Sequence, residues 1–163
     1  MDIIANLLTF IVILIGLYFT YQLVNLFVTI KRARKEDSSL QFCLTTVGKA
    51  FYIGISILVL IVIGIAIYVL IYGIKQDNVT IFRNSIAVIS LAIIIYTMQM
   101  VNIVLVGKKN MMVGRMLIDY RKMKKVDITY GNEMTFIFGQ KTYKISTRFV
   151  ELTTLRKAIS RRR

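Results

Sequence analysis

Few residues in this chain have side chains that could catalyse a reaction or hold a metal ion. The 163 residues include no His and a single Cys, Cys43. His is the most common general base, and one thiol is too few for a thiolate metal site. Asp119 and Asp127 could form an acid–base pair, but charge balance on a basic surface is the simpler explanation. We therefore predict that the chain is not an enzyme and holds no metal or cofactor.

Neutral polar side chains recur inside long apolar runs and are the remaining candidates for a site. Four of them, within residues 18–25, are spaced i, i+3, i+4 and i+7, so a helix places them on one face. Two more, at 99 and 102, belong to a later run and lie at a similar distance from the end of that run, which is about the same depth in a membrane. Such groups bond between helices in membranes. We expect these interhelical polar contacts at Tyr18, Gln22, Asn25, Gln99 and Asn102. A ligand or solute site at the same depth is the alternative.

Three uncharged apolar runs, at 3–30, 50–74 and 85–106, would carry these side chains. Each exceeds the roughly 20 residues that a helix needs to cross a bilayer core of about 30 Å. Backbone polar groups in lipid have to be satisfied within the segment, which favours helices. We predict three transmembrane helices in a domain spanning residues 1–106. The first run is too long for a signal peptide and no basic segment precedes it, so we expect a retained anchor.

Lys and Arg residues are unevenly distributed among the segments that connect these runs. The first link contains Lys31, Arg32, Arg34, Lys35 and Lys49, the second contains only Lys75 and Arg83, and the other fifteen all follow residue 107. Basic connections usually lie in the cytosol. We therefore predict a multi-pass protein of the cell (plasma) membrane, with its N-terminus outside and its C-terminus in the cytosol. Cys43 then lies in a cytosolic link as a small apolar residue, with reversible lipidation as the alternative.

Residues 107–163 form a predominantly basic segment with patterns typical of strands. Apolar and polar residues alternate at 126–130, 134–138 and 143–145, and 116–120 is a further candidate strand. Gly131-Asn132 and Gly139-Gln140 separate these runs, which predicts a β-meander with tight turns. Apolar residues at 149, 152, 155 and 159 then predict an amphipathic helix, capped by Thr147 and with Glu151 in its first turn. The predicted fold class is membrane α-helical, with three transmembrane helices followed by a small cytosolic α+β module.

The module has one family resemblance. It contains the segment YRKMKKVDI at 120–128, strand-like segments at 134–138 and 142–146, and a final helical segment. In this order of segments, residues 116–159 resemble the C-terminal half of bacterial pleckstrin-homology-like modules. Such modules follow helical hairpins in some small Firmicute membrane proteins. The resemblance implies a strand-plus-helix module and no particular ligand.

Basic residues near the predicted cytosolic face are candidates for contact with a membrane surface or a partner. They are Lys31, Arg32, Arg34, Lys35, Arg121, Lys122, Lys124, Lys125, Arg161, Arg162 and Arg163. Each Lys or Arg held near an anionic leaflet contributes about 1 kcal/mol. An acidic protein surface is the alternative, and no nucleic acid is expected because no recognised nucleic-acid motif is present. The partners we expect are the anionic inner leaflet and either a second copy or another membrane protein.

These observations favour a non-enzymatic accessory or scaffold subunit of a membrane assembly that presents a basic cytosolic module. Two alternatives remain open. One is a self-protection (immunity) protein against a membrane-active peptide or bacteriocin, a role that suits small cationic multi-span proteins. The other is an oligomeric channel or transporter subunit in which the neutral polar side chains line a pathway.

Overall fold

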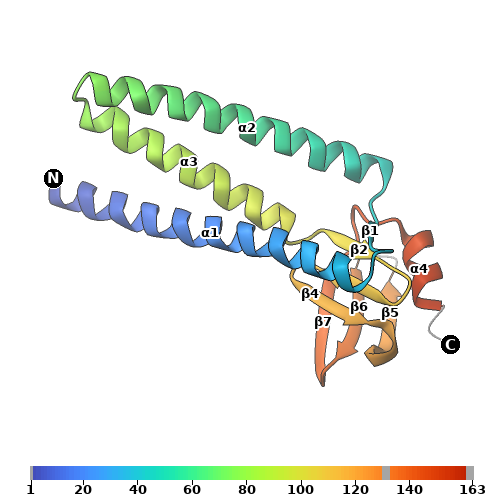
Figure 1. Ribbon diagram of the computed structural model, residues 1–163. Coiled ribbons are helices and arrows are strands. Elements are labelled where there is room, and N and C mark those ends of the chain that lie inside the picture. The colour runs from blue at the N-terminus through green and yellow to red at the C-terminus, as the bar shows by residue number, and fades with distance from the viewer. Residues whose placement is uncertain (1, 130–132, 161–163) are drawn as a thin grey trace. The chain divides into compact units, whose positions relative to one another are not determined.

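The computed structural model describes residues 2–129 and 133–160 and contains three long apolar helices. They are α1 (Asp2–Glu36), α2 (Thr46–Lys75) and α3 (Val79–Met100) (Figure 1). All three are long and apolar enough to cross a membrane. The prediction of three such helices is therefore confirmed at the level of length and composition.

The ends of these helices differ from the apolar runs of the sequence. The first helix continues through the basic residues to Glu36. The third begins at Val79, where the Asn78 side chain accepts the backbone N–H groups of Thr80 and Ile81, each at 3.1 Å, as an N-cap. It ends at Met100, so the prediction that the third helix continues to residue 106 is wrong. The last three residues of that run form a fully buried strand, and a buried strand is as continuously apolar as a membrane helix.

The chain forms two compact units. One, the helix unit, contains α1 up to Val24, α2 from Tyr52 and α3 up to Gln99. The other, the sheet unit, contains residues 25–51 and the chain from Met100 onward. The boundary at Phe51 and Met100 assigns the link between α1 and α2 to the same unit as the C-terminal segment.

In the helix unit, α3 packs against both other helices (Figure 1). Against α1, Gly16 faces Ser90 so closely that a Cβ at Gly16 would lie 2.6 Å from the Ser90 Oγ. Against α2, the Tyr96 hydroxyl lies 3.1 Å from Ser56 Oγ, and the Tyr52 hydroxyl donates to the Gln99 carbonyl at 3.4 Å. Small side chains and hydroxyl hydrogen bonds therefore hold these helices together, as is typical inside membranes.

The sheet unit contains two antiparallel sheets. The first has the order β1-β2-β3-β4, with β1 (Gln41–Phe42), β2 (Val104–Val106), β3 (Asn110–Val113) and β4 (Met116–Asp119). A short 3-10 helix, η1 (Tyr120–Lys122), follows. The second sheet is the meander β5-β6-β7, with β5 (Lys124–Thr129), β6 (Glu133–Phe138) and β7 (Lys141–Ser146). The meander confirms the sequence prediction, whereas β1, β2 and β3 were not predicted.

Strand β1 lies in the link before α2 but pairs with β2, which follows α3. The pairs are Gln41 with Val106 and Phe42 with Leu105. An isolated bridge between Leu44 and Val150 adds the segment after β7 to the same link. The helices α2 and α3 are thus an insertion, in chain order, between two hydrogen-bonded neighbouring strands.

The core of the sheet unit is formed by alternate residues of the strands and by the apolar side of α4 (Leu152–Ser160). Leu155 and Ala158 of α4 are buried in it, whereas Arg156 and Lys157 are exposed, so the predicted amphipathic helix is confirmed. Its predicted cap is wrong. The helix begins at Leu152, after Glu151, whose carboxylate accepts hydrogen bonds from Thr153 and Thr154. Thr147 instead lies in a turn that closes with the Val150 N–H.

The turn between β6 and β7 has the geometry that its sequence predicts. Gly139 and Gln140 both have positive φ, at 55° and 66°, between the paired residues Phe138 and Lys141. Two consecutive positive values are typical of the type I′ hairpin turn. The other predicted turn, at Gly131-Asn132, lies outside the described residues.

Candidate interaction surface

The end of α1 is attached to the β2–β3 turn through one carboxylate. Asp37 is buried, and its Oδ2 accepts the backbone N–H groups of Lys109 and Asn110, each at 3.2 Å. Its Oδ1 accepts the N–H of Ser39 at 3.1 Å as well as the Ser39 hydroxyl. Ser39 Oγ in turn accepts the N–H of Lys108 at 2.7 Å. These bonds fix the backbone of Lys108 and Lys109 beside the last turn of α1.

The same β2–β3 turn also contacts the start of η1. Tyr120 donates its backbone N–H to the Lys109 carbonyl at 3.2 Å, and Asn110 pairs with Asp119 across β3 and β4. Asp119 caps η1 by accepting the Arg121 N–H at 2.8 Å. The backbone of the β2–β3 turn therefore has contacts with the end of α1 and with the start of η1, and each of these three parts of the chain carries exposed cations. We call this set the basic ridge: Lys35, Lys108, Lys109, Arg121 and Lys122.

Hydrogen bonding keeps Asp37 ionised. Burial by itself raises the pKa of this carboxyl group, but the hydrogen bonds from Ser39, Lys109 and Asn110 outweigh burial and hold the pKa below its usual value of 3.8. The Asp37 carboxylate is thus hydrogen-bonded to the Ser39 hydroxyl and to backbone N–H groups of Ser39, Lys109 and Asn110. All five cationic side chains of the ridge are exposed.

Clustered cations of one sign produce a positive potential that attracts anionic surfaces. The predicted residues Lys31, Arg32 and Arg34 lie earlier on α1, and Lys124 and Lys125 lie at the start of β5, all with exposed side chains. The guanidinium of Arg34 lies over the Phe42 ring at 5.1 Å, which orients it by a cation–π contact. The predicted contacts at Arg161, Arg162 and Arg163 lie outside the described residues.

Lys108 and Lys109 belong to the ridge but are not among the contact residues that the sequence predicts. Their signal is the polar segment GKKN between the apolar segments VLV and MMV, a spacing typical of a hairpin. This hairpin signal is hard to recognise because VLV is also the end of the apolar run at 85–106, which predicts a helix.

Only some of the polar residues predicted to bond between helices have such a contact in the structure. The hydrogen bond at Gln99 uses its backbone carbonyl, with Tyr52 as donor. Tyr18 is exposed and stacks edge-on against Phe19 of its own helix, at 5.6 Å between ring centroids. Gln22 and Asn25 are half-buried on α1. Asn102 follows the end of α3, so the prediction that it lies on the third helix is wrong. A role of the Gln and Asn side chains between helices stays a prediction.

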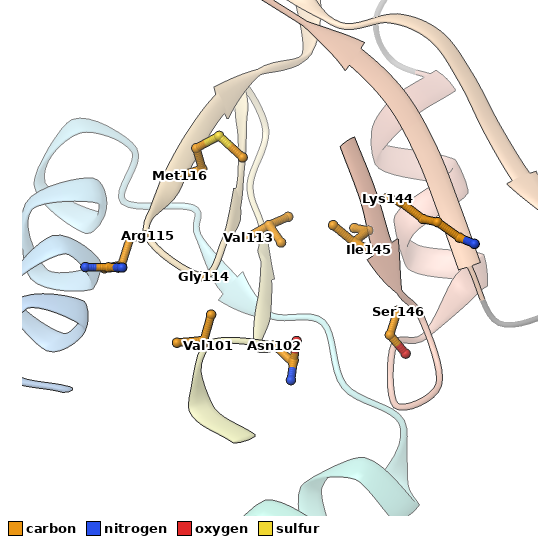
Figure 2. A pocket seen from close by; sticks show the side chains of 9 residues that line it. All are labelled: Val101, Asn102, Val113, Gly114, Arg115, Met116, Lys144, Ile145 and Ser146. Carbon is orange, nitrogen blue, oxygen red and sulfur yellow. The ribbon is translucent and has the colours of Figure 1, made fainter. Parts of the chain in front are cut away.

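A groove of about 510 Å³ opens between the β3–β4 turn, the link from α3 to β2 and the end of β7. Figure 2 shows Val113 and Ile145 pointing toward each other across it, with Asn102 below them. Lys144 extends away from the groove and pairs with Glu133 at 2.7 Å. The groove is thus lined by apolar and polar side chains together, and its two cations are Arg115 and the ion-paired Lys144.

Asp119 and Asp127, the possible acid–base pair, lie on strands of different sheets. Asp119 lies on β4 of the first sheet, where it caps η1, and Asp127 lies on β5 of the second sheet. Cys43 is buried in the core, with its thiol 3.4 Å from the Glu151 carbonyl, and burial raises the pKa of that thiol. Asp119 therefore has a capping role, and Cys43 is part of the core of the sheet unit.

Comparisons of the chain with protein-family models, with curated proteins and with solved structures found no match. The interpretation of the basic ridge therefore depends on its geometry and charge.

Proposed function

We propose that this protein is a non-enzymatic accessory or scaffold subunit of a membrane assembly. In this proposal α1, α2 and α3 cross the cell membrane, and the sheet unit, a pleckstrin-homology-like module in the sense of the sequence resemblance, lies at the cytosolic face. The N-terminus is outside. The distribution of Lys and Arg supports this orientation, because the cations concentrate in the link after α1 and in the segment after α3.

The observation that carries the proposal is the way the basic ridge is built. Its backbone is fixed by the buried Asp37 carboxylate and by the pairing of Asn110 with Asp119, while its cationic side chains stay exposed. A surface with a fixed backbone and exposed cationic side chains is suited to binding an anionic surface of complementary potential. The anionic surface is an acidic face of a membrane-protein partner or the anionic inner leaflet.

The orientation is tested by labelling intact cells. In a Cys43→Ala background, Gln76→Cys places a thiol in the exposed link between α2 and α3, and Lys109→Cys places one on the ridge. We expect a membrane-impermeant maleimide to label the first variant and not the second. Labelling of Lys109→Cys from outside would contradict the cytosolic assignment.

The partner is tested by gentle extraction from native membranes followed by affinity purification. We expect the unmodified chain to retain a membrane-protein partner in a fixed ratio, and the variant K108Q/K109Q/R121Q/K122Q to lose it. The control is K141Q/K144Q, which removes charges from β7, away from the ridge. If the unmodified chain is recovered as an isolated monomer after crosslinking, the accessory role is wrong. If both variants retain the partner equally, the ridge is not the contact surface.

A further inference from the structure

The side of α1 opposite α3 carries an uncovered stripe of large side chains. Gly16 marks the side that packs on α3, and residues two positions away from it point in nearly the opposite direction. That opposite side is formed by Leu7, Ile11, Leu14, Tyr18 and Tyr21, all exposed. Their spacing of four, three, four and three residues is the heptad spacing of helices that pack along their length. We call these five residues the α1 stripe.

The two tyrosines make lipid an unfavourable cover for this stripe. Tyr18 and Tyr21 are 58% and 64% exposed. Tyr18 lies 13 positions before Lys31, roughly 20 Å along the helix and therefore deep in the hydrocarbon core if α1 spans the bilayer. Within residues 2–129 and 133–160, neither hydroxyl has a hydrogen-bond partner. A hydroxyl that is left unbonded in hydrocarbon is destabilising, because lipid tails offer neither donors nor acceptors.

The chemistry of the stripe identifies a second copy of the same chain as its cover. A phenol hydroxyl both donates and accepts, so two identical rows of tyrosines satisfy each other across a two-fold axis. The stripe carries no formal charge, so two copies do not repel each other along it. The next heptad position along α1 is Asn25, whose amide also both donates and accepts, and a single Asn at such a position fixes the register of paired helices.

We propose that the α1 stripe is the interface of a homodimer in which the α1 helices of two copies pack side by side and parallel, joined by hydrogen bonds between Tyr18 and Tyr21. This inference rests on α1 crossing the bilayer, which the proposed function also assumes. It does not depend on the basic ridge or on the partner that binds there.

The first test is disulfide crosslinking of the purified full chain in liposomes, in a Cys43→Ala background. Leu7 and Leu8 form a matched pair, because they are the same residue type, 61% and 60% exposed, and only Leu7 belongs to the stripe. A disulfide requires Cα atoms within about 7 Å. We expect an oxidant to convert Leu7→Cys and Leu14→Cys largely to covalent dimers and to leave Leu8→Cys and Ile15→Cys mainly monomeric. Equal crosslinking of the two sets, or none at the stripe positions, would overturn the proposal.

The second test keeps Cys43 and measures dimerisation by energy transfer between labelled copies in liposomes. The variant Y18F/Y21F removes only the two hydroxyls, and we expect it to weaken dimerisation about tenfold. The control is Tyr68→Phe on α2, which removes the hydroxyl of a tyrosine that is exposed, at 73%, but lies outside the stripe, and we expect no change. An unchanged dissociation constant for Y18F/Y21F would show that the hydroxyls do not join two copies. If the unmodified chain dimerises but retains no other membrane protein after gentle extraction, the accessory role is disproved and this inference still stands.

Discussion

Gly48, in the first turns of α2, lies directly against the backbone of Phe149, which precedes α4. A Cβ at Gly48 would be 2.8 Å from the Phe149 carbonyl oxygen and 2.9 Å from its Cβ. The same carbonyl accepts the backbone N–H of Thr45 at 2.9 Å, and the Phe149 ring stacks on Phe51 at 4.8 Å between centroids. The start of α2 and the segment before α4 are therefore fixed to each other by backbone contact, which leaves no space for a side chain at residue 48.

The first prediction concerns this contact. Gly48→Ala places a methyl group against a backbone atom that has little freedom to move, so we expect a net loss of about 1 kcal/mol or more in the free energy of unfolding, although Ala favours a helix. Gly54→Ala, in the same helix but with open space around it, should be neutral or stabilising. The measurement is thermal exposure of Cys43 to a fluorogenic thiol reagent, because this single Cys is buried in the native core. Equal midpoints for the two variants would contradict the prediction.

The second prediction concerns the contact between α1 and α3. Gly16→Val places an isopropyl group beside Ser90, whose Oγ would lie 2.6 Å from the Cβ alone. We expect a loss of about 1–3 kcal/mol, because the helices have to separate to accommodate the added volume. Gly64→Val on α2 has open space and is the matched control. Unfolding in SDS followed by circular dichroism measures both, and a control as unstable as Gly16→Val would refute the packing argument.

The third prediction concerns the pH dependence of the Asp37 contacts. Because the pKa of Asp37 is lower in the folded chain than its usual value of 3.8, ionised Asp37 stabilises the fold above about pH 4. This stabilisation disappears as the pH falls through the lowered pKa. Asp37→Asn loses charge-assisted hydrogen bonds to Lys109 and Asn110, and we expect it to be less stable by about 2 kcal/mol at pH 7.

The two proteins should converge in stability as the pH falls below about 4. Thermal midpoints at pH 7, 5 and 3.5 measure this convergence, and Asp127→Asn, which removes an exposed carboxylate on β5, is the control. A difference between Asp37→Asn and the unmodified chain that is constant with pH would show that the charge of Asp37 does not contribute.

The fourth prediction concerns the turn between β6 and β7. A Cβ at Gly139 would meet nothing within 4 Å, so the only penalty of Gly139→Ala is its φ of 55°. We expect a loss of about 1 kcal/mol. Gln140 has a φ of 66°, and Gln140→Gly should stabilise the hairpin by about 0.5–1 kcal/mol. Changes of the same sign in the two thermal midpoints would contradict the assigned turn.

Local patterns in the sequence were enough to predict the helices and the second sheet. Long uncharged runs fold as helices in an apolar environment because only a helix satisfies its own backbone, and α1, α2 and α3 follow those runs. Alternation at Met134 and Phe136 predicts a strand with one buried face, and both side chains are fully buried. The positive φ of Gly139 follows from residue type, since Gly alone has no Cβ to oppose it.

Only the tertiary structure determined where α3 ends, where β1 lies and how the basic ridge is assembled. A strand of two residues such as β1 has no local signal. Its hydrogen bonds come from β2, which follows α2 and α3 in the chain. Val104–Val106 is buried on both faces and therefore has no alternation that distinguishes a strand from a helix. Lys109 lies beside the end of α1 because the Asp37 carboxylate binds its backbone N–H, and a contact between residues so far apart in the chain depends on the folded arrangement of both segments.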